Sequence, residues 1–316
     1  MTKKIKEIEE ISELAEVLKQ LGSPEPGYTR FFRGHPKKSY ILKPSIYRED
    51  QEKSPGNPNY LIKNEDNIIR DAFTNCHDSF NQSDTLFEKL VKLQHYGYST
   101  RLLDLTSNVL VALYFATDKD PEEDGEIVVL DIPNDQIKYD DSDVVSILSA
   151  ISLRKSNFSI NQDDSKEEFN KDKEIARLIH DIRRDKPGFL AEINPNDLSR
   201  VVCVKAKLNN PRIIRQQGSF LIFGMDSKKC TCSKVPEEWK KTLNMPIYIN
   251  RKYKDNIQKE LKSFGISHQN LFPELDSQAK DILAQYCEKE VPKSSQEESL
   301  SPLKKLVRCI QSRCSV

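Results

Sequence analysis

Residues 109–116 read Val-Leu-Val-Ala-Leu-Tyr-Phe-Ala, which is apolar almost throughout. A segment without a polar face is buried on several sides, whichever secondary structure it adopts. We predict that these residues form a helix inside the core.

The spacing of apolar residues elsewhere predicts further helices and several strands. Helical periodicity is found in residues 5–21, 62–73, 86–95, 144–153, 175–184 and 257–264. Strand-like runs occupy residues 28–33, 126–132, 201–206, 220–223 and 245–250. This mixture indicates the α+β class, and we predict one mixed domain over residues 1–289.

Two polar segments interrupt the pattern. Residues 134–173 are charged and polar apart from one helical piece, so we predict an insertion or a mobile loop. Residues 290–316 are predicted to be a flexible linker followed by a short basic amphipathic tail. The tail either docks on its own domain, which its small apolar area favours, or contacts an anionic membrane or a partner.

Composition excludes several classes of protein. The chain has 316 residues with 49 basic and 49 acidic side chains, and this balance argues against a broad nucleic-acid-binding surface. Its start lacks the apolar core of a secretory signal, and no run reaches the roughly 20 apolar residues of a membrane span, so we expect a cytoplasmic protein. The seven cysteines are scattered, and only Cys230 and Cys232 lie close together, so no metal site is predicted.

The segment Phe-Arg-Gly at residues 32–34 is the first candidate for a binding site. Arg33 at the end of a strand can bind a phosphate or carboxylate bidentately, while Gly34 lets the backbone close around the ligand. Several further basic residues make this part of a neutral chain locally positive. The alternative is that Arg33 forms an ordinary salt bridge.

A second candidate follows the predicted helix that ends near His95. The polar side chains before the apolar segment are Ser99, Thr100, Arg101, Asp104 and Thr106. They line a polar pocket, or else Arg101 pairs with Asp104 and Thr106 caps the next helix.

Gln216 and Gln217 form the third candidate, because they precede a glycine and an apolar strand. If this entrance is extended, one glutamine points into a pocket, and otherwise both lie on an exposed strand entrance. The sequence shows no hydrolase triad, zinc spacing, P-loop or dinucleotide fingerprint.

These motifs together resemble the FRG domain family, which is named for its Phe-Arg-Gly motif and occurs in bacterial and phage-associated proteins. The resemblance rests on residues 32–34, 93–106, 112–116 and 271–276 and on Arg-x-x-x-Gln-Gln-Gly-x-Phe ending at Phe220. It covers about residues 5–285.

The chain is also distantly similar to ADP-ribosyltransferases of the Arg-Ser-Glu type, which act on NAD. Arg33 matches their early arginine, Ser99 and Thr100 their Ser-Thr-Ser segment, and Gln216 and Gln217 their late motif. This resemblance implies a largely antiparallel, split sheet flanked by helices, and NAD as co-substrate with no cofactor needed for folding. Arg33 would then bind the NAD phosphates or ribose, and glycosidic cleavage would pass through an oxocarbenium-like state.

The family's catalytic glutamate has no counterpart in the late motif, so Glu126 or Glu192 would have to approach from elsewhere. The resemblances imply a toxin or antiphage effector. The residues assigned to catalysis are Arg33, Thr100, Arg101, Asp104 and Gln217, and those assigned to ligand binding are Arg33, Gly34, His95, Ser99, Thr100, Thr106 and Gln216.

Two other functions remain open at this point. The first is that of a non-catalytic module that binds a nucleotide through Arg33 and Arg101. The second is that of an interaction protein whose motifs only stabilise its fold. The enzyme and the nucleotide-binding module both require Arg33, Thr100, Arg101 and Gln217 to share one cleft, and the interaction protein does not.

Overall fold

The computed structural model describes residues 6–48, 59–161, 163–242, 246–275, 277–279 and 282–283. The chain divides into two compact units, Met1–Glu274 and Leu275–Val316. All elements below belong to the first unit. The predicted linker and tail at 290–316 lie outside the described residues.

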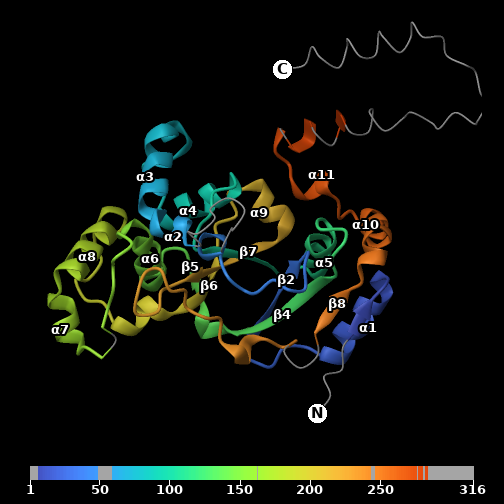
Figure 1. The fold of residues 1–316 in the computed structure, drawn as a ribbon, viewed down its shortest axis with the longest axis horizontal. Coiled ribbons are helices and arrows are strands. Elements are labelled where there is room, and N and C mark those ends of the chain that lie inside the picture. The colour runs from blue at the N-terminus through green and yellow to red at the C-terminus, as the bar shows by residue number, and fades with distance from the viewer. Residues whose placement is uncertain are drawn as a thin grey trace, which may run out of the picture. The chain divides into compact units, whose positions relative to one another are not determined.

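An eight-stranded mixed sheet forms the centre of this unit, in the order β1-β8-β4-β2-β3-β7-β6-β5 (Figure 1). The β1/β8 and β5/β6 pairs are parallel and the other neighbours are antiparallel. The strands are β1 (Lys6–Ile8), β2 (Tyr28–His35), β3 (Leu102–Thr106), β4 (Gly125–Pro133), β5 (Ile137–Tyr139), β6 (Val201–Lys205), β7 (Gly218–Phe223) and β8 (Ile247–Ile249). The predicted α+β class with a largely antiparallel sheet is confirmed.

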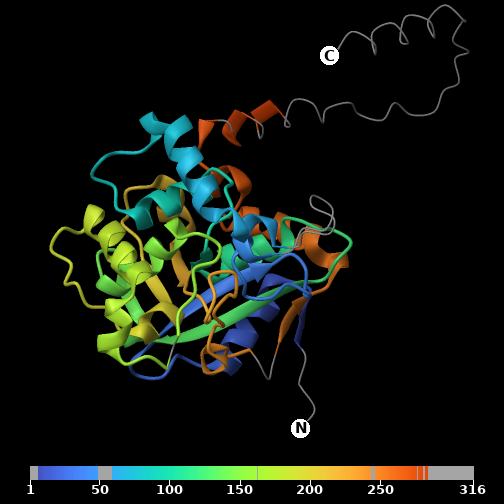
Figure 2. The same ribbon diagram turned by 60° about the vertical axis from the view of Figure 1, so that its left-hand side comes forward.

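The sheet is nearly divided at its centre. Strands β2 and β4 run side by side over eight register pairs, from Tyr28 opposite Pro133 to His35 opposite Glu126 (Figure 2). In contrast, β2 and β3 share one register pair, Phe32 opposite Thr106. The backbone of β2 therefore leaves β3 directly after Phe32.

Helices cover the two halves of the sheet separately. The segment Val109–Thr117 forms α5, as predicted, and it packs against β2, β4 and β3. With α1 (Ile11–Leu21) and α10 (Lys254–Ser263) it closes one apolar cluster beside β2, β4 and β8. Figure 1 shows α1 and α10 at the β8 side of the sheet.

A second cluster lies over the half containing β6 and β7. It is built on α3 (Glu65–Asn75), α4 (Leu86–His95), α6 (Asp143–Ala150) and α8 (Lys173–Asp185). The remaining helices are short and comprise α2 (Tyr60–Lys63), α7 (Lys166–Lys171), α9 (Pro211–Gln216) and α11 (His268–Leu271). Alternate residues of β2 face opposite sides of the sheet, since Phe31 joins one cluster and Phe32 another.

Residues 134–173, which were predicted to be an insertion or a mobile loop, include regular secondary structure. This segment contains β5, α6 and α7, and Val145, Leu148 and Phe169 are buried in the core. The charged residues of α7 are exposed, whereas Asp140 and Arg154 are buried, and a polar average over forty residues conceals the apolar residues of the core.

Three local predictions also differ from the structure. Residues 6–8 form strand β1 instead of extending the first helix, because they pair with β8. Residues 102–106 form β3, a strand that the sequence did not predict. Gln216 and Gln217 lie at the end of helix α9 and not on an extended strand entrance.

Gly34 allows β2 to touch α5. A Cβ atom at this position would overlap the carbonyl oxygen of Ala112 and lie 2.7 Å from the amide nitrogen of Ala116. Both neighbours are helix backbone and cannot rotate away, so the glycine of the Phe-Arg-Gly segment is required for close approach.

We expect Gly34→Ala to lower the free energy of unfolding by about 1–3 kcal/mol, the usual cost of overpacking. Gly188→Ala is the matched control, because a Cβ there meets no atom within 4 Å. Urea denaturation measures both. Equal midpoints for the two variants would show that β2 and α5 can separate without cost.

Candidate functional site

A cavity of about 380 Å³ lies where β2 separates from β3. We call it the β2–β3 cleft. Its lining comprises Phe32, Arg33, Gly34, His35, Pro36, Tyr40 and Arg48 from β2 and the chain after it, Asp104, Leu105 and Thr106 from β3, Phe115, Asp118, Lys119 and Asp120 from the end of α5, and Arg212, Gln216 and Phe272. The volume falls within the range of small-molecule pockets.

Arg33 spans the gap between the two strands. Its Nη1 donates a hydrogen bond to the backbone carbonyl of Asp104 at 2.6 Å, which satisfies a carbonyl next to the point where β2 departs. Its Nε donates to Nε2 of His35 at 3.2 Å. The Asp104 carboxylate lies 4.0 Å away, so this charged pair is loose.

Burial lowers the pKa of Arg33 to about 10, because desolvation outweighs the opposing influence of Asp104. Arg48 also lowers the pKa of Arg33, and burial lowers that of Arg48 itself. Both guanidinium groups are still protonated at neutral pH. The cleft therefore holds two poorly solvated cations that destabilise each other.

The buried His35 accepts a hydrogen bond from Arg33. Its side chain is buried, Nδ1 lies 3.4 Å from Oε2 of Glu126, and Nε2 accepts the hydrogen bond from Arg33. This pattern assigns a neutral imidazole with its proton on Nδ1. Burial is the main cause of the lowered pKa of His35, with Arg33 adding to the effect and the Glu126 hydrogen bond opposing it.

Because the folded-state pKa of His35 is lowered, the unfolded chain binds a proton here at pH values where the folded chain does not. The free energy of unfolding should therefore fall as the pH drops below 6.5, the ordinary histidine value, and continue to fall until the folded-state pKa is passed. We expect His35→Gln to show a smaller fall in urea denaturation between about pH 8 and about pH 5. The exposed His77, changed to glutamine, is the control. Parallel pH profiles for wild type and His35→Gln would contradict this role.

A hydrogen-bond chain orients the Asp104 carboxylate. The Thr100 hydroxyl donates to Oε1 of Gln94 at 2.5 Å, and Nε2 of Gln94 donates to Oδ1 of Asp104 at 2.8 Å. Thr100 is buried, whereas the Asp104 side chain is 61% exposed. Thr100 thus acts on the cleft through Gln94 and does not line it.

Thr106 and Gln216 close the opposite wall. The Thr106 hydroxyl donates to the backbone carbonyl of Gln216 at 2.7 Å and accepts from the amide of Asn108. Asn108, and not Thr106, is the N-cap of α5, since its side chain accepts from the amide of Leu110. The predicted capping role of Thr106 is therefore wrong, although its place in the cleft is observed.

Arg101 does not share the cleft. Its guanidinium is fully buried, and Nε and Nη2 donate to the two carboxylate oxygens of Glu65 at 3.0 and 2.5 Å. Nη1 donates to the carbonyl of Phe223, and Lys229 approaches Glu65 from another side. The alternative of an Arg101–Asp104 pair is wrong because the carboxylate that pairs with Arg101 comes from α3, and the structure places Arg101, assigned to catalysis from the sequence, outside the cleft lining.

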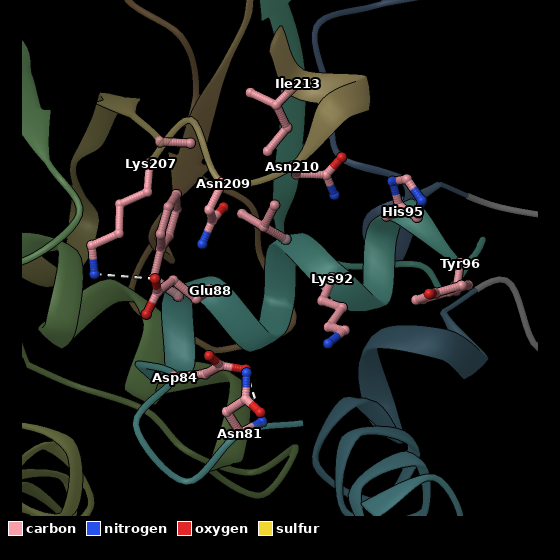
Figure 3. A pocket seen from close by; sticks show the side chains of 13 residues that line it. Asn81, Asp84, Glu88, Lys92, His95, Tyr96, Lys207, Asn209, Asn210 and Ile213 are labelled. Carbon is pink, nitrogen blue, oxygen red and sulfur yellow. Dashed lines mark hydrogen bonds and ion pairs between the residues drawn. The ribbon is translucent and has the colours of Figure 1, made fainter. Parts of the chain in front are cut away.

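Three other predicted residues lie outside the cleft lining. His95 lines a separate cavity beside α4, with Asn210 and Ile213 across from it (Figure 3), and its Nε2 lies 2.9 Å from Glu274. Gln217 is exposed at the left-handed end of α9, where its Oε1 accepts from Ser107. Ser99 precedes the buried Thr100 and is likewise absent from the lining.

The two glutamates considered as substitutes for a catalytic acid are also accounted for. Oε2 of Glu126 lies 3.4 Å from Nδ1 of His35. Glu192 pairs with Lys166 at 2.7 Å, and neither lines the cleft. Within the described ranges, no group of three or more His, Cys, Asp or Glu side chains is arranged to hold a metal ion.

The sequence did not single out several lining residues. Arg212 places its guanidinium 4.5 Å from the ring centroid of Phe272 and donates to the carbonyl of His95. Arg48 lies over the Tyr40 ring at 5.7 Å. Tyr40 and Arg48 belong to a segment that the sequence shows to be locally basic, so a signal for this pair existed. No sequence signal connects Arg212 with Phe272.

Comparison with known proteins gives one family. No curated protein and no solved structure matches the chain. In the part that the structure describes, no helix is long and apolar enough to cross a membrane. Residues 29–125 match the family model of the FRG domain, and this range includes β2, β3 and α5. The chain therefore carries an FRG domain, whose Phe-Arg-Gly segment lies in the wall of the β2–β3 cleft.

Proposed function

We propose that the β2–β3 cleft binds a phosphate-bearing ligand, with Arg33 as its anchor. The observation that carries this proposal is the incomplete neutralisation of Arg33. Its close partners among the described residues are a backbone carbonyl and a neutral imidazole, while the nearest carboxylate stands 4.0 Å away. The Arg33 side chain is only 16% exposed, and a cation so largely removed from water is costly unless an anion joins it.

The rest of the lining supports a nucleotide as the ligand. Arg48 adds positive charge next to Arg33, and Phe115 and Tyr40 offer aromatic surface for a base or a nicotinamide ring. A phosphate at the arginines and a ring against the aromatic wall would use both parts of the cleft. NAD is the nucleotide that we propose first.

Isothermal titration calorimetry of the full chain with NAD, ADP and inorganic phosphate tests this function. We expect saturable binding of NAD and ADP, weaker binding of phosphate alone, and affinities that fall as salt is added. Absence of binding by all three at millimolar concentration would refute the proposal.

Asp104 favours a second, catalytic function, the cleavage of NAD. Its carboxylate is oriented by Gln94 and remains exposed at the cleft beside Arg33. We propose that it stabilises the positive charge that develops on the ribose as the bond between its C1′ carbon and the nicotinamide nitrogen breaks and water or a target side chain bonds to the same carbon. On this account the protein is an NAD-consuming or ADP-ribosylating effector of bacterial toxin or phage-defence systems.

Asp104→Asn should reduce nicotinamide release by about 10²–10³-fold while leaving NAD affinity within a few-fold. Chromatography of NAD reactions measures turnover, and Asp135→Asn at a surface turn is the matched control. Intact NAD with unmodified protein and nucleic acid, despite tight binding, would leave a non-catalytic nucleotide-binding module.

A further inference from the structure

Lys254 joins two separate parts of the cleft rim. It is the first residue of α10 and is 1% exposed. Its ammonium donates hydrogen bonds to the carbonyls of Pro36, Lys119 and Asp120 at 2.8, 3.0 and 2.9 Å. All three carbonyl residues belong to the cleft lining.

One of these rim residues has an unfavourable backbone conformation. Asp120 has φ of 53°, in the left-handed region that non-glycine residues seldom occupy. Such a conformation persists when its surroundings fix it, and it is found disproportionately at functional sites. Lys254 donates to the carbonyls of both peptide units that flank the Cα of Asp120, and Lys37 lies 3.4 Å from the Asp120 carboxylate.

The next turn of α10 reinforces the contact. Nε2 of Gln258 donates to the carbonyl of Tyr114 at 3.2 Å and to the hydroxyl of Thr117 at 2.7 Å. The carbonyl of Tyr114 also accepts from the amide of Asp118, so Gln258 adds a donor from a second helix at the end of α5. Lys254 and Gln258, four residues apart on one helix face, thus connect α10 to the end of α5 and the turn after it.

We propose that Lys254 is a positioning residue of the β2–β3 cleft, which keeps Pro36 and the 118–120 turn in the conformation that admits the ligand. The proposal rests on the proposed nucleotide function for its effect on binding. Its effect on the rim is independent of any ligand. Three carbonyls that share one buried ammonium lose their donor together when Lys254 is replaced by an apolar residue.

Hydrogen exchange measured by mass spectrometry tests the effect on the rim in the ligand-free full chain. We expect Lys254→Met to raise exchange by about tenfold or more in peptides covering residues 35–38 and 117–124, with the β6–β7 half unchanged. Lys254→Arg, which keeps a charged donor, should restore much of the protection. Lys259→Met, at an exposed position of the same helix, is the control.

NAD titration of the same four proteins tests the effect on the site. Lys254→Met should weaken NAD binding by about tenfold, with Lys254→Arg between it and wild type. A folded Lys254→Met protein with a protected rim overturns the proposal, as does a loosened rim with unchanged NAD affinity. If wild type binds no nucleotide, the proposed function fails, and the exchange data alone then decide whether Lys254 fixes the rim.

Discussion

Replacing Arg101 with alanine should lower the free energy of unfolding by about 3–5 kcal/mol, the cost of removing one partner of a buried ion pair. Arg101 and Glu65 are 0% and 1% exposed, and Nε and Nη2 of Arg101 bond both carboxylate oxygens. Without Arg101, Glu65 keeps Lys229 at 3.2 Å, but the carbonyl of Phe223 loses its donor. Urea denaturation followed by circular dichroism measures the loss.

Arg70→Ala is the matched control for this prediction. Arg70 pairs with Asp66 on α3, the helix that carries Glu65, but the Arg70 side chain is half exposed. Its removal should therefore lower the free energy of unfolding by less than about 1 kcal/mol. Arg101→Lys should recover little, because one ammonium cannot replace two parallel hydrogen bonds. A stable Arg101→Ala protein that has lost nucleotide binding would instead place Arg101 in the binding machinery.

Arg33→Ala should differ from Arg101→Ala, because we expect the fold to be preserved and the nucleotide affinity to fall by about 10²-fold or more. Arg33 donates to Asp104 and His35 but lacks a close carboxylate, and its burial is unfavourable enough to lower its pKa to about 10. Removing it relieves that desolvation and abolishes the charge-assisted contacts with a phosphate. Calorimetry with NAD measures affinity, and thermal unfolding without ligand measures stability.

Arg30→Ala supplies the comparison on the same strand. Arg30 forms a bidentate pair with Asp131 at 2.6 and 2.7 Å and does not line the cleft. Its loss should therefore affect stability and spare NAD affinity. If Arg33→Ala also loses stability and retains affinity, Arg33 is a structural residue like Arg30.

Local periodicity predicted most elements of the fold. Residues 86–95 and 109–116 matched α4 and α5 closely, because capping and apolar patterning act within one helix. Helix α9 was missed even though Asn210 before Pro211 is a helix-start signal. Strand β3 was missed because its pairing with β7 lies more than a hundred residues away in the sequence.

The candidate site was predicted in part. Arg33, Gly34, Asp104, Thr106 and Gln216 do line one cleft, whereas Thr100, Arg101 and Gln217, which were expected to share it with Arg33, do not. The sequence could not reveal that Arg101 pairs with a glutamate 36 residues earlier, because side-chain partners depend on tertiary packing. The contributions of Arg212, Phe272 and Lys254 could not be foreseen for the same reason, since these residues come from the C-terminal part of the chain, far in sequence from Arg33.

A crystal structure of the protein with NAD bound tests the central claim most directly. We expect phosphate oxygens within about 3 Å of the Arg33 guanidinium, in the gap where β2 leaves β3. The nicotinamide or adenine ring should lie against the aromatic wall that includes Phe115. A nucleotide bound in the cavity beside α4, or an empty β2–β3 cleft at saturating NAD, would contradict the account.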